Sequence, residues 1–296
     1  MHRIVVGIDG SSSSLAALRW AAQEARARGS TVRAVLVAGA LDAHGRIVGE
    51  RVDAGHAQRE ARGELDALVD AALAGRPPED ARDVEREVVV GLPAPALLDA
   101  AADADLLVVG SRGLGGFRGL LLGSVSRAVM QRARCPVVVV REGAEHVTGN
   151  HRVVVGVDGS PQAAVALDWA FDAAALRGAQ VEIVSTWALR SELHDRMSVS
   201  PVDPAPLEDV AHWAIDKAVA SAGTTALDVR RTVAFGSPAA AILDAAQHAD
   251  LVVLGSRGLG EFSGWALGSV SHHVAQHAPC PVVVLPPDAT RRLNVR

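Results

Sequence analysis

The sequence lacks the features of several protein classes. Only two cysteines, Cys135 and Cys280, occur in the chain, so there is no disulfide framework and a reducing compartment is favoured. The net charge of -5 shows no basic excess, which argues against a general nucleic-acid-binding protein. No apolar run reaches the ~20 residues that span a bilayer, and no secretory signal precedes the first strand-like run. We therefore expect a cytoplasmic protein without a membrane span.

The length and an internal repeat indicate two domains. The chain has 296 residues, which exceeds one average domain of ~150 residues, and its composition is that of a globular protein. RIVVGIDGS at residues 3–11 returns as RVVVGVDGS at 152–160, GSRGLG at 110–115 returns at 255–260, and CPVVV at 135–139 returns at 280–284. We predict two copies of one domain, at residues 1–141 and 150–286, joined by a short polar linker at 142–150.

Short apolar strands alternate with helices in each copy. The expected strands of copy one are Ile4–Ile8, Val32–Val37, Glu87–Val90, Leu106–Val109 and Val137–Val140, and its expected helices are Ser12–Arg28, Ala57–Ala74, Ala94–Ala102 and Ser124–Ala133. The expected strands of copy two are Val153–Val157, Val181–Ser185, Val229–Val233, Leu251–Leu254 and Val282–Leu285. This alternation predicts an α/β fold with a parallel sheet covered by helices on both faces. The irregular segments Gly39–Gly55 and Leu189–Pro206 are expected to be exposed connections.

A glycine-rich loop is the central motif of each copy. It reads Gly-x-x-Gly, nine residues, then Gly-Ser, and its glycines are Gly110, Gly113 and Gly123 in copy one and Gly255, Gly258 and Gly268 in copy two. The first glycine follows a strand, and the Gly-Ser pair opens a helix, where free N–H groups and the helix dipole favour an anion. We expect the N–H groups of Gly123 and Gly268 to be free to face a phosphate.

Other residues of the loop add to this expectation. The hydroxyls of Ser124 and Ser126, and those of Ser269 and Ser271, lie at the expected helix starts. Arg112 and Arg257 can add a charge-assisted contact to a phosphate. A plain glycine-rich turn followed by an N-cap uses the same residue types, but the repeated spacing between a strand and a helix favours a phosphate-binding loop.

An aspartate ends the first strand of each copy. Ligands of open α/β sheets bind beyond the carboxyl ends of the strands, so Asp9 and Asp158 are expected to face the glycine-rich loops. A carboxylate there can accept hydrogen bonds from ribose hydroxyls or from an adenine amine. The alternative is that each aspartate caps the helix that follows it, which its Asp-Gly-Ser context also suits.

Taken together, these motifs resemble the universal stress proteins, in the tandem two-domain form of their ATP-binding branch. The start motif, the loop motif and the Cys-Pro-Val-Val-Val ending occur in that order in both copies. The resemblance implies two Rossmann-like domains of the adenine nucleotide alpha hydrolase type, each with a five-stranded parallel sheet in the order 3-2-1-4-5. It also implies that the two copies pair through Cys135–Val140 and Cys280–Leu285, and that two chains form a homodimer.

The same resemblance implies a set of residues that bind ATP. In copy one these are Gly7, Asp9, Val37, Gly110, Ser111, Arg112, Gly113, Gly123, Ser124, Val125 and Ser126. In copy two they are Gly156, Asp158, Thr186, Gly255, Ser256, Arg257, Gly258, Gly268, Ser269, Val270 and Ser271. No catalytic residue and no metal ligand is assigned, and Mg²⁺ is expected to come with the phosphates of ATP.

The expected function is that of a nucleotide-dependent regulator of a stress response or of growth. No P-loop sequence with its lysine is present and no general base is evident, so efficient catalysis is not expected. A slow ATP hydrolase and an interaction module with vestigial sites remain alternatives. In copy two Glu261 and Trp265 replace Gly116 and Leu120, and a carboxylate that points at the triphosphate would weaken that site.

Two smaller features receive no functional assignment. His273 and His277 share a helix face at a spacing that a metal could use, but no acidic or thiol ligand is evident nearby, so a solvated face is expected. Cys135 and Cys280 precede prolines at strand starts and are expected to be small core residues.

Overall fold

The computed structural model divides into two compact units, one up to Val147 and the next from Thr148. It describes residues 2–39, 54–77, 80, 84–115, 121–145, 149–188, 205–222, 227–259 and 267–287. The two irregular connections that the sequence predicts therefore lie almost entirely outside the described residues. Among the residues described, no helix is long and apolar enough to cross a membrane.

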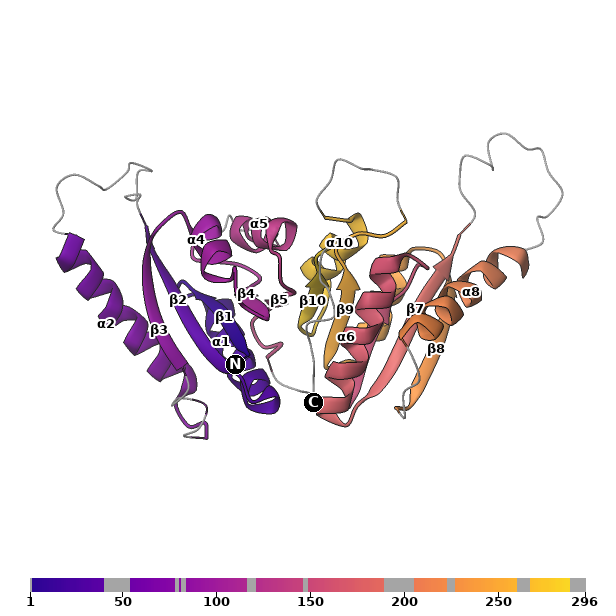
Figure 1. Ribbon diagram of the computed structural model, residues 1–296, viewed down its shortest axis with the longest axis horizontal. Coiled ribbons are helices and arrows are strands. Elements are labelled where there is room, and N and C mark those ends of the chain that lie inside the picture. Colours follow the sequence, from indigo (N-terminus) through magenta and orange to yellow (C-terminus); the bar gives the residue numbers. More distant parts are fainter. Residues whose placement is uncertain are drawn as a thin grey trace. The chain divides into compact units, whose positions relative to one another are not determined.

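Strands and helices alternate along each unit (Figure 1). Unit 1 contains β1 (Arg3–Ile8), α1 (Ser12–Arg28), β2 (Thr31–Gly39), α2 (Ala54–Leu73), β3 (Val84–Gly91), α4 (Pro93–Ala100), β4 (Leu106–Gly110), α5 (Ser124–Arg132) and β5 (Val137–Val140). Unit 2 contains β6 (Arg152–Gly156), α6 (Pro161–Arg177), β7 (Gln180–Trp187), α8 (Ala205–Ala222), β8 (Val229–Phe235), α9 (Pro238–Ala246), β9 (Leu251–Gly255), α10 (Ser269–His277) and β10 (Val282–Leu285).

The sheet topology confirms the predicted order. In the described part of unit 1 the strands lie in the order β3-β2-β1-β4-β5, and in unit 2 they lie in the order β8-β7-β6-β9-β10. The neighbouring strands within each unit are parallel. Strands β4 and β5 are buried along their whole length, as continuous apolar runs in a parallel sheet should be. Each unit therefore has the strand order 3-2-1-4-5 when its strands are numbered from the start of that unit.

Two glycines show that helices cover both faces of the sheet. Ile4 pairs with Leu106 and Val6 with Val108, so Gly110 continues on the face of Ile8 and opposite to Gly7. A Cβ at Gly7 would overlap Leu97 of α4, whereas one at Gly110 would overlap Ser13 of α1. Helices α1 and α4 thus pack on opposite faces, as the sequence predicts for a doubly wound fold.

Local sequence signals explain where the long helices begin and end. Helix α1 begins after Ser11, whose hydroxyl accepts a hydrogen bond from the Ser14 N–H, and ends at Gly29 with φ of 62°. Helix α6 repeats this arrangement with Ser160 and with Gly178 at φ of 57°. The structure thus confirms that the serine cluster caps the start of α1 and that Gly29 caps its end.

The third strand of unit 1 starts earlier than the sequence predicts, at Val84 rather than at Glu87. This strand lies at the end of its unit's strand order, where charged side chains are tolerated. Arg33 of β2 lies 3.5 Å from carboxylate oxygens of both Glu85 and Glu87. The start of this strand was missed because its first residues are mostly charged, and the prediction relied on apolar runs.

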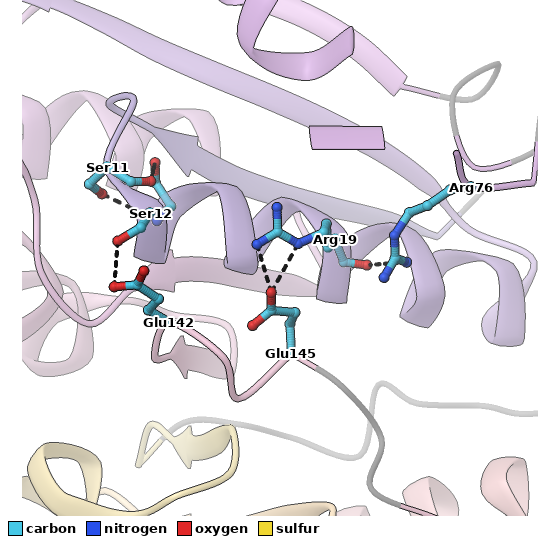
Figure 2. A network of polar contacts seen from close by, with 7 residues as sticks. Ser11, Ser12, Arg19, Arg76, Glu142 and Glu145 are labelled. Atoms are coloured by element: carbon cyan, nitrogen blue, oxygen red, sulfur yellow. Dashed lines mark hydrogen bonds and ion pairs between the residues drawn. The ribbon is translucent and has the colours of Figure 1, made fainter. Parts of the chain in front are cut away.

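The start of the expected linker belongs to unit 1 instead. Ser12 donates to Glu142 Oε2 at 2.7 Å, and Arg19 donates from Nε and Nη2 to Glu145 Oε1 at 3.0 and 2.6 Å (Figure 2). Glu145 is only 3% exposed, so its charge is balanced inside the protein rather than by water. The expectation of a polar linker from residue 142 was wrong here because these acidic side chains find partners on α1.

Removing Arg19 should destabilise unit 1. Arg19→Ala breaks the buried ion pair between Arg19 and Glu145, and such a loss costs about 3 kcal/mol or more. The matched control is Arg62→Ala, since the Arg62–Asp66 pair is exposed and should contribute at most about 1 kcal/mol. Urea unfolding of the full chain measures both free energies of unfolding, and equal losses would contradict the assignment.

Both cysteines are free and buried, which confirms the expectation of small core residues. Desolvation by burial raises the pKa of Cys135 to about 11 and that of Cys280 to about 12. Each native thiol therefore keeps its proton in a range where an unfolded thiol, with a pKa of about 8.5, loses it. The contribution of the two thiols to stability is present below about pH 8.5 and is lost as the pH rises toward the folded values.

We predict that neither cysteine reacts with a thiol reagent in the native protein. The thiolate is the nucleophile, and at pH 8 burial leaves almost none of it. Disulfide-exchange labelling at pH 8 should modify Cys135 and Cys280 only after denaturation in urea. Stoichiometric labelling of the folded chain within the mixing time would show that the thiols are more accessible than their burial implies.

Candidate functional site

The glycine-rich loop and the aspartate meet at the carboxyl edge of each sheet. Asp9 follows β1 and the loop follows β4, and these two strands are parallel neighbours. The Leu114 N–H donates to Asp9 Oδ2 at 3.2 Å. In unit 2 the Leu259 N–H donates to Asp158 Oδ2 at 2.8 Å. The tertiary structure thus brings together the two motifs that the sequence places about 100 residues apart.

The second oxygen of each aspartate fixes the start of the following helix. Asp9 Oδ1 accepts from the Ser11 N–H at 3.0 Å and from the Ser11 hydroxyl at 2.6 Å. Asp158 Oδ1 accepts from the Ser160 N–H at 3.0 Å. The residue that caps helix α1 is Ser11, so the alternative in which Asp9 is the N-cap was wrong. Asp9 connects the helix start to the loop.

Close packing explains two of the motif's glycines in unit 1 and one in unit 2. A Cβ at Gly113 would overlap Asp9 Oδ2, and a Cβ at Gly258 would overlap Asp158 Oδ2. A Cβ at Gly110 would lie 2.5 Å from Ser13 Oγ and 2.7 Å from backbone atoms of Ser13 and Ser14. The glycines let the loop lie directly on the aspartate and on helix α1.

Serine hydroxyls hold the loop of unit 1 in a way that the sequence interpretation missed. Ser11 Oγ donates to the Arg112 carbonyl at 3.1 Å, and Ser13 Oγ donates to the same oxygen. The Arg112 N–H in turn donates to Ser13 Oγ at 3.3 Å. The signal was present in the run of four serines at 11–14, which was interpreted only as a helix cap.

The N–H groups of Gly123 and Gly268 are not free, so that expectation was wrong. Gly123 donates to the Ser111 carbonyl and Gly268 to the Ser256 carbonyl, each at 2.7 Å. These bonds close the loop onto its own start. The hydroxyls of Ser126 and Ser271 are also engaged, because each donates at 2.6 Å to the carbonyl of the glycine that ends the preceding strand.

The N–H groups available to an anion are those of the residues that follow Gly123 and Gly268. The first intrahelical bond of α5 runs from the Arg127 N–H to the Gly123 carbonyl, and no side chain caps the helix. The N–H groups of Ser124, Val125 and Ser126 are therefore left without an intrahelical partner. In α10 the bond from His272 to Gly268 has the same consequence for Ser269, Val270 and Ser271. Both helix starts suit a phosphate group.

Comparison with known proteins agrees with this geometry. The sequence model of the universal stress protein family matches residues 1–141 and 149–286. The chain belongs to the universal stress protein family. A relative from Mycobacterium tuberculosis is 32% identical over 300 residues, covering 95% of this chain and 94% of the relative. Another, from Mycolicibacterium smegmatis, is 34% identical over 300 residues and covers 97% of both chains. Both relatives are described as universal stress proteins.

A solved structure shares the fold of this universal stress protein. The crystal structure of a universal stress protein from Archaeoglobus fulgidus matches with a TM-score of 0.66 at 21% sequence identity. The match covers 96% of this chain and 98% of the other. It supports the tandem α/β architecture and no more than that.

The register places two further predicted residues at the same edge. Ile8 pairs with Leu36, so Val37 comes level with Asp9 on the neighbouring strand. Gly156 pairs with Val184, so Thr186 comes level with Asp158. Both side chains are half-buried. Val37 and Thr186 therefore flank the aspartates of this universal stress protein, and their expected role in ATP binding stays a prediction.

Gly7 and Gly156 have a packing role in the structure. A Cβ at Gly7 would lie 2.8 Å from Leu97 of α4, and one at Gly156 would lie 2.7 Å from Ile242 of α9. Gly7 lies next to the end of β1 and Gly156 is the last residue of β6, and both face the helices on the sheet face opposite to α1 and α6. Close helix packing accounts for glycine at these two positions without a ligand.

The remaining predicted residues differ in exposure. Arg112 and Arg257 are exposed, and neither guanidinium makes a hydrogen bond or ion pair within the described ranges. Ser111 and Ser256 are buried directly after β4 and β9. Ser256 Oγ has no hydrogen-bond partner among the described residues. Four of the residues at which the loops of the two copies differ, Gly116, Leu120, Glu261 and Trp265, lie outside the described residues.

A metal centre is not formed in the part of the chain that the structure describes, where no group of three histidine, cysteine or carboxylate side chains comes together. His273 and His277 stack with ring centroids 4.2 Å apart, and His277 Nδ1 lies 2.8 Å from the His273 carbonyl oxygen. The contact between His277 Nδ1 and the His273 carbonyl oxygen lies within helix α10.

Gly110→Ala should destabilise unit 1, because its methyl group has no room beside the backbone of α1. We expect a loss of about 1–3 kcal/mol in the free energy of unfolding, as for other overpacked sites. Gly115→Ala is the matched control from the same loop, since a Cβ there would meet nothing within 4 Å. Thermal unfolding of both variants measures the difference, and a Gly110→Ala midpoint as high as that of the control would contradict the packing.

Proposed function

We propose that each unit binds one ATP, with Mg²⁺ carried on the phosphates, and that the chain acts as a nucleotide-dependent regulator of a stress response or of growth. The observation that carries this proposal is the start of helices α5 and α10. Each presents three N–H groups without an intrahelical partner, at the carboxyl edge of a parallel sheet. Family membership is consistent with the proposal but does not carry it alone.

The residues around the helix starts can divide the nucleotide between them. In unit 1 the N–H groups of Ser124 to Ser126 and the exposed Arg112 guanidinium are placed to bind the phosphates. Asp9 uses its two oxygens within the protein, but an ionised carboxylate offers about four acceptor sites and can still accept from a ribose hydroxyl. Val37, level with Asp9, is the candidate for the adenine edge.

A regulator fits the site better than an efficient catalyst does. The loops at 110–126 and 255–271 contain no lysine, and lysine is the residue that P-loop enzymes place on the transferred phosphate. Binding alone can act as a signal when ATP stabilises one conformation or assembly over another. Slow ATP hydrolysis and an interaction role without nucleotide are the alternatives that the experiments below separate.

The proposal also includes the assembly and the location of the protein. We infer that the apolar strands β5 and β10 pair within one chain, that two chains form a homodimer, and that the protein acts in the cytoplasm. Uninterrupted apolar runs at the ends of their units' strand orders support the pairing, because apolar edge strands invite pairing. Sedimentation of the purified chain with and without ATP tests the dimer.

The direct test is a calorimetric titration of nucleotide-stripped protein with Mg-ATP. Two ATP molecules per chain are expected. Turnover well above the uncatalysed rate would favour the hydrolase alternative. A correctly folded chain that binds no ATP would overturn the proposal and favour an interaction module whose glycines only form turns.

Gly123→Ala combined with Gly268→Ala should remove ATP binding without unfolding the chain. At Gly123 the nearest atoms to a Cβ lie 3.5 Å away, and at Gly268 the Ser256 carbonyl oxygen lies at 3.2 Å, so the fold accommodates both methyl groups with a small shift. Each methyl stands at an N-cap beside the phosphate donors. We expect affinity to fall by about a hundredfold or more at each site, equivalent to ~2.8 kcal/mol.

The matched control is Gly63→Ala in α2, where a Cβ meets nothing within 4 Å. It should leave ATP affinity unchanged. Calorimetry gives the affinities, and circular dichroism verifies the fold of each variant. Unchanged ATP affinity in the folded double variant would show that these helix starts do not hold the phosphates.

A further inference from the structure

Unit 2 gathers aromatic side chains at the ends of two strands and on helix α8, where the described residues of unit 1 have aliphatic ones. The chain has only nine aromatic residues of the Phe and Trp types and no tyrosine. Three of the nine, Trp187, Trp213 and Phe235, lie at the ends of β7 and β8 and on helix α8. The corresponding residues of unit 1 are aliphatic.

The structure fixes this correspondence independently of the sequence repeat. Trp187 pairs with Phe235 across β7 and β8, and Ala38 pairs with Val90 across β2 and β3. Trp213 lies 3.5 Å from the Cβ position at Gly159. Leu68 of α2 lies 3.7 Å from the same position at Gly10, in the equivalent turn. Ala38, Leu68 and Val90 therefore occupy in unit 1 the places of the three aromatic residues.

The aromatic rings are accessible and lie beside the aspartate of unit 2. Trp213 is 57% exposed and Phe235 is 65% exposed. The rings of Trp187 and Phe235 have centroids 4.7 Å apart with their planes tilted by 60°. Trp187 directly follows Thr186, which is level with Asp158, and Trp213 borders the Gly159 turn. Exposed rings at a ligand-binding edge are suited to stack on a flat apolar ligand.

The only lysine of the chain is fixed at the same place. Lys217 Nζ donates to the Gly159 carbonyl at 3.0 Å and lies 4.8 Å from the centroid of the Trp213 ring. Helix α2 of unit 1 has Ala72 at the corresponding position. Unit 2 therefore combines aromatic rings with a cation next to Asp158, and this is the chemistry that recognises a nucleotide rather than an uncharged apolar partner.

We propose that unit 2 is a base-stacking nucleotide site, in which Trp213, together with Trp187 and Phe235, holds the purine base and Lys217 adds a charge contact. Unit 1 holds its nucleotide without stacking, so the two sites of one chain differ in affinity and in their dependence on the base. This inference rests on the proposed ATP binding and goes beyond it by assigning the base to named residues. Stacking of one base on an aromatic side chain contributes enough to change affinity about tenfold.

The test isolates unit 2 in the full chain. Gly123→Ala silences unit 1, and stripped protein is titrated with Mg-ATP and, separately, with inorganic tripolyphosphate, which has no base. Because the chain lacks tyrosine and Trp20 and Trp169 are buried, quenching of the exposed tryptophans reports on the base alongside calorimetry. Trp213→Leu then gives unit 2 the residue of unit 1, at an exposed position where the fold should tolerate the change.

We expect Trp213→Leu to weaken ATP binding about tenfold, to remove most of the ATP-induced quenching and to leave tripolyphosphate binding unchanged. The reverse exchange serves as the matched variant: Leu68→Trp, in a chain whose unit 2 carries Gly268→Ala, should strengthen ATP binding by unit 1. Unchanged ATP affinity in Trp213→Leu, or an equal loss for ATP and tripolyphosphate, would overturn the stacking role. Absence of ATP binding by the unaltered chain would instead refute the nucleotide function on which the inference rests.

Discussion

The carboxylate at the end of the first strand is the interaction on which each site depends. Asp9 joins the start of α1, through Ser11, to the loop after β4, through the Leu114 N–H. Asp158 makes the same connection in unit 2. Gly113 and Gly258 follow from this contact, because any side chain there would displace the carboxylate. The contacts of the aspartate with the helix start and with the loop thus determine the shape of the loop.

The two units keep this frame but support it differently. In unit 1 the hydroxyls of Ser11 and Ser13 hold the Arg112 carbonyl. Gln162 takes the place of Ser13 in unit 2, and among the described residues neither it nor Ser160 makes such a bond to Arg257. Among the described residues, the loop of unit 1 therefore has more hydrogen bonds to the start of its neighbouring helix than the loop of unit 2 has. In unit 2, Trp213 and Lys217 lie beside the turn at Gly159.

Much of the fold and part of the site could be predicted from the sequence. Uninterrupted valine runs identify β4 and β5 as buried parallel strands, and the repeated loop spacing places a helix start after β4 and β9. The errors share one cause, since each depends on a partner that is distant in sequence. The first residues of β3 are charged and pair with β2, and Glu145 is buried against Arg19. A polar residue does not reveal by itself whether its partner is water or protein.

The sequence by itself determined the two-unit plan, the alternation of strands and helices and the identity of the loop and the aspartate, because periodicity and spacing are local properties that the backbone must follow. The strand order was implied only by the resemblance to the universal stress proteins. Only the tertiary structure decided which polar groups are left for a ligand. The Gly123 N–H is used by the Ser111 carbonyl, and Gly7 is required by Leu97 across the sheet. Hydrogen-bond satisfaction and close packing depend on atoms brought together from distant parts of the chain, so they are settled only when the chain has folded.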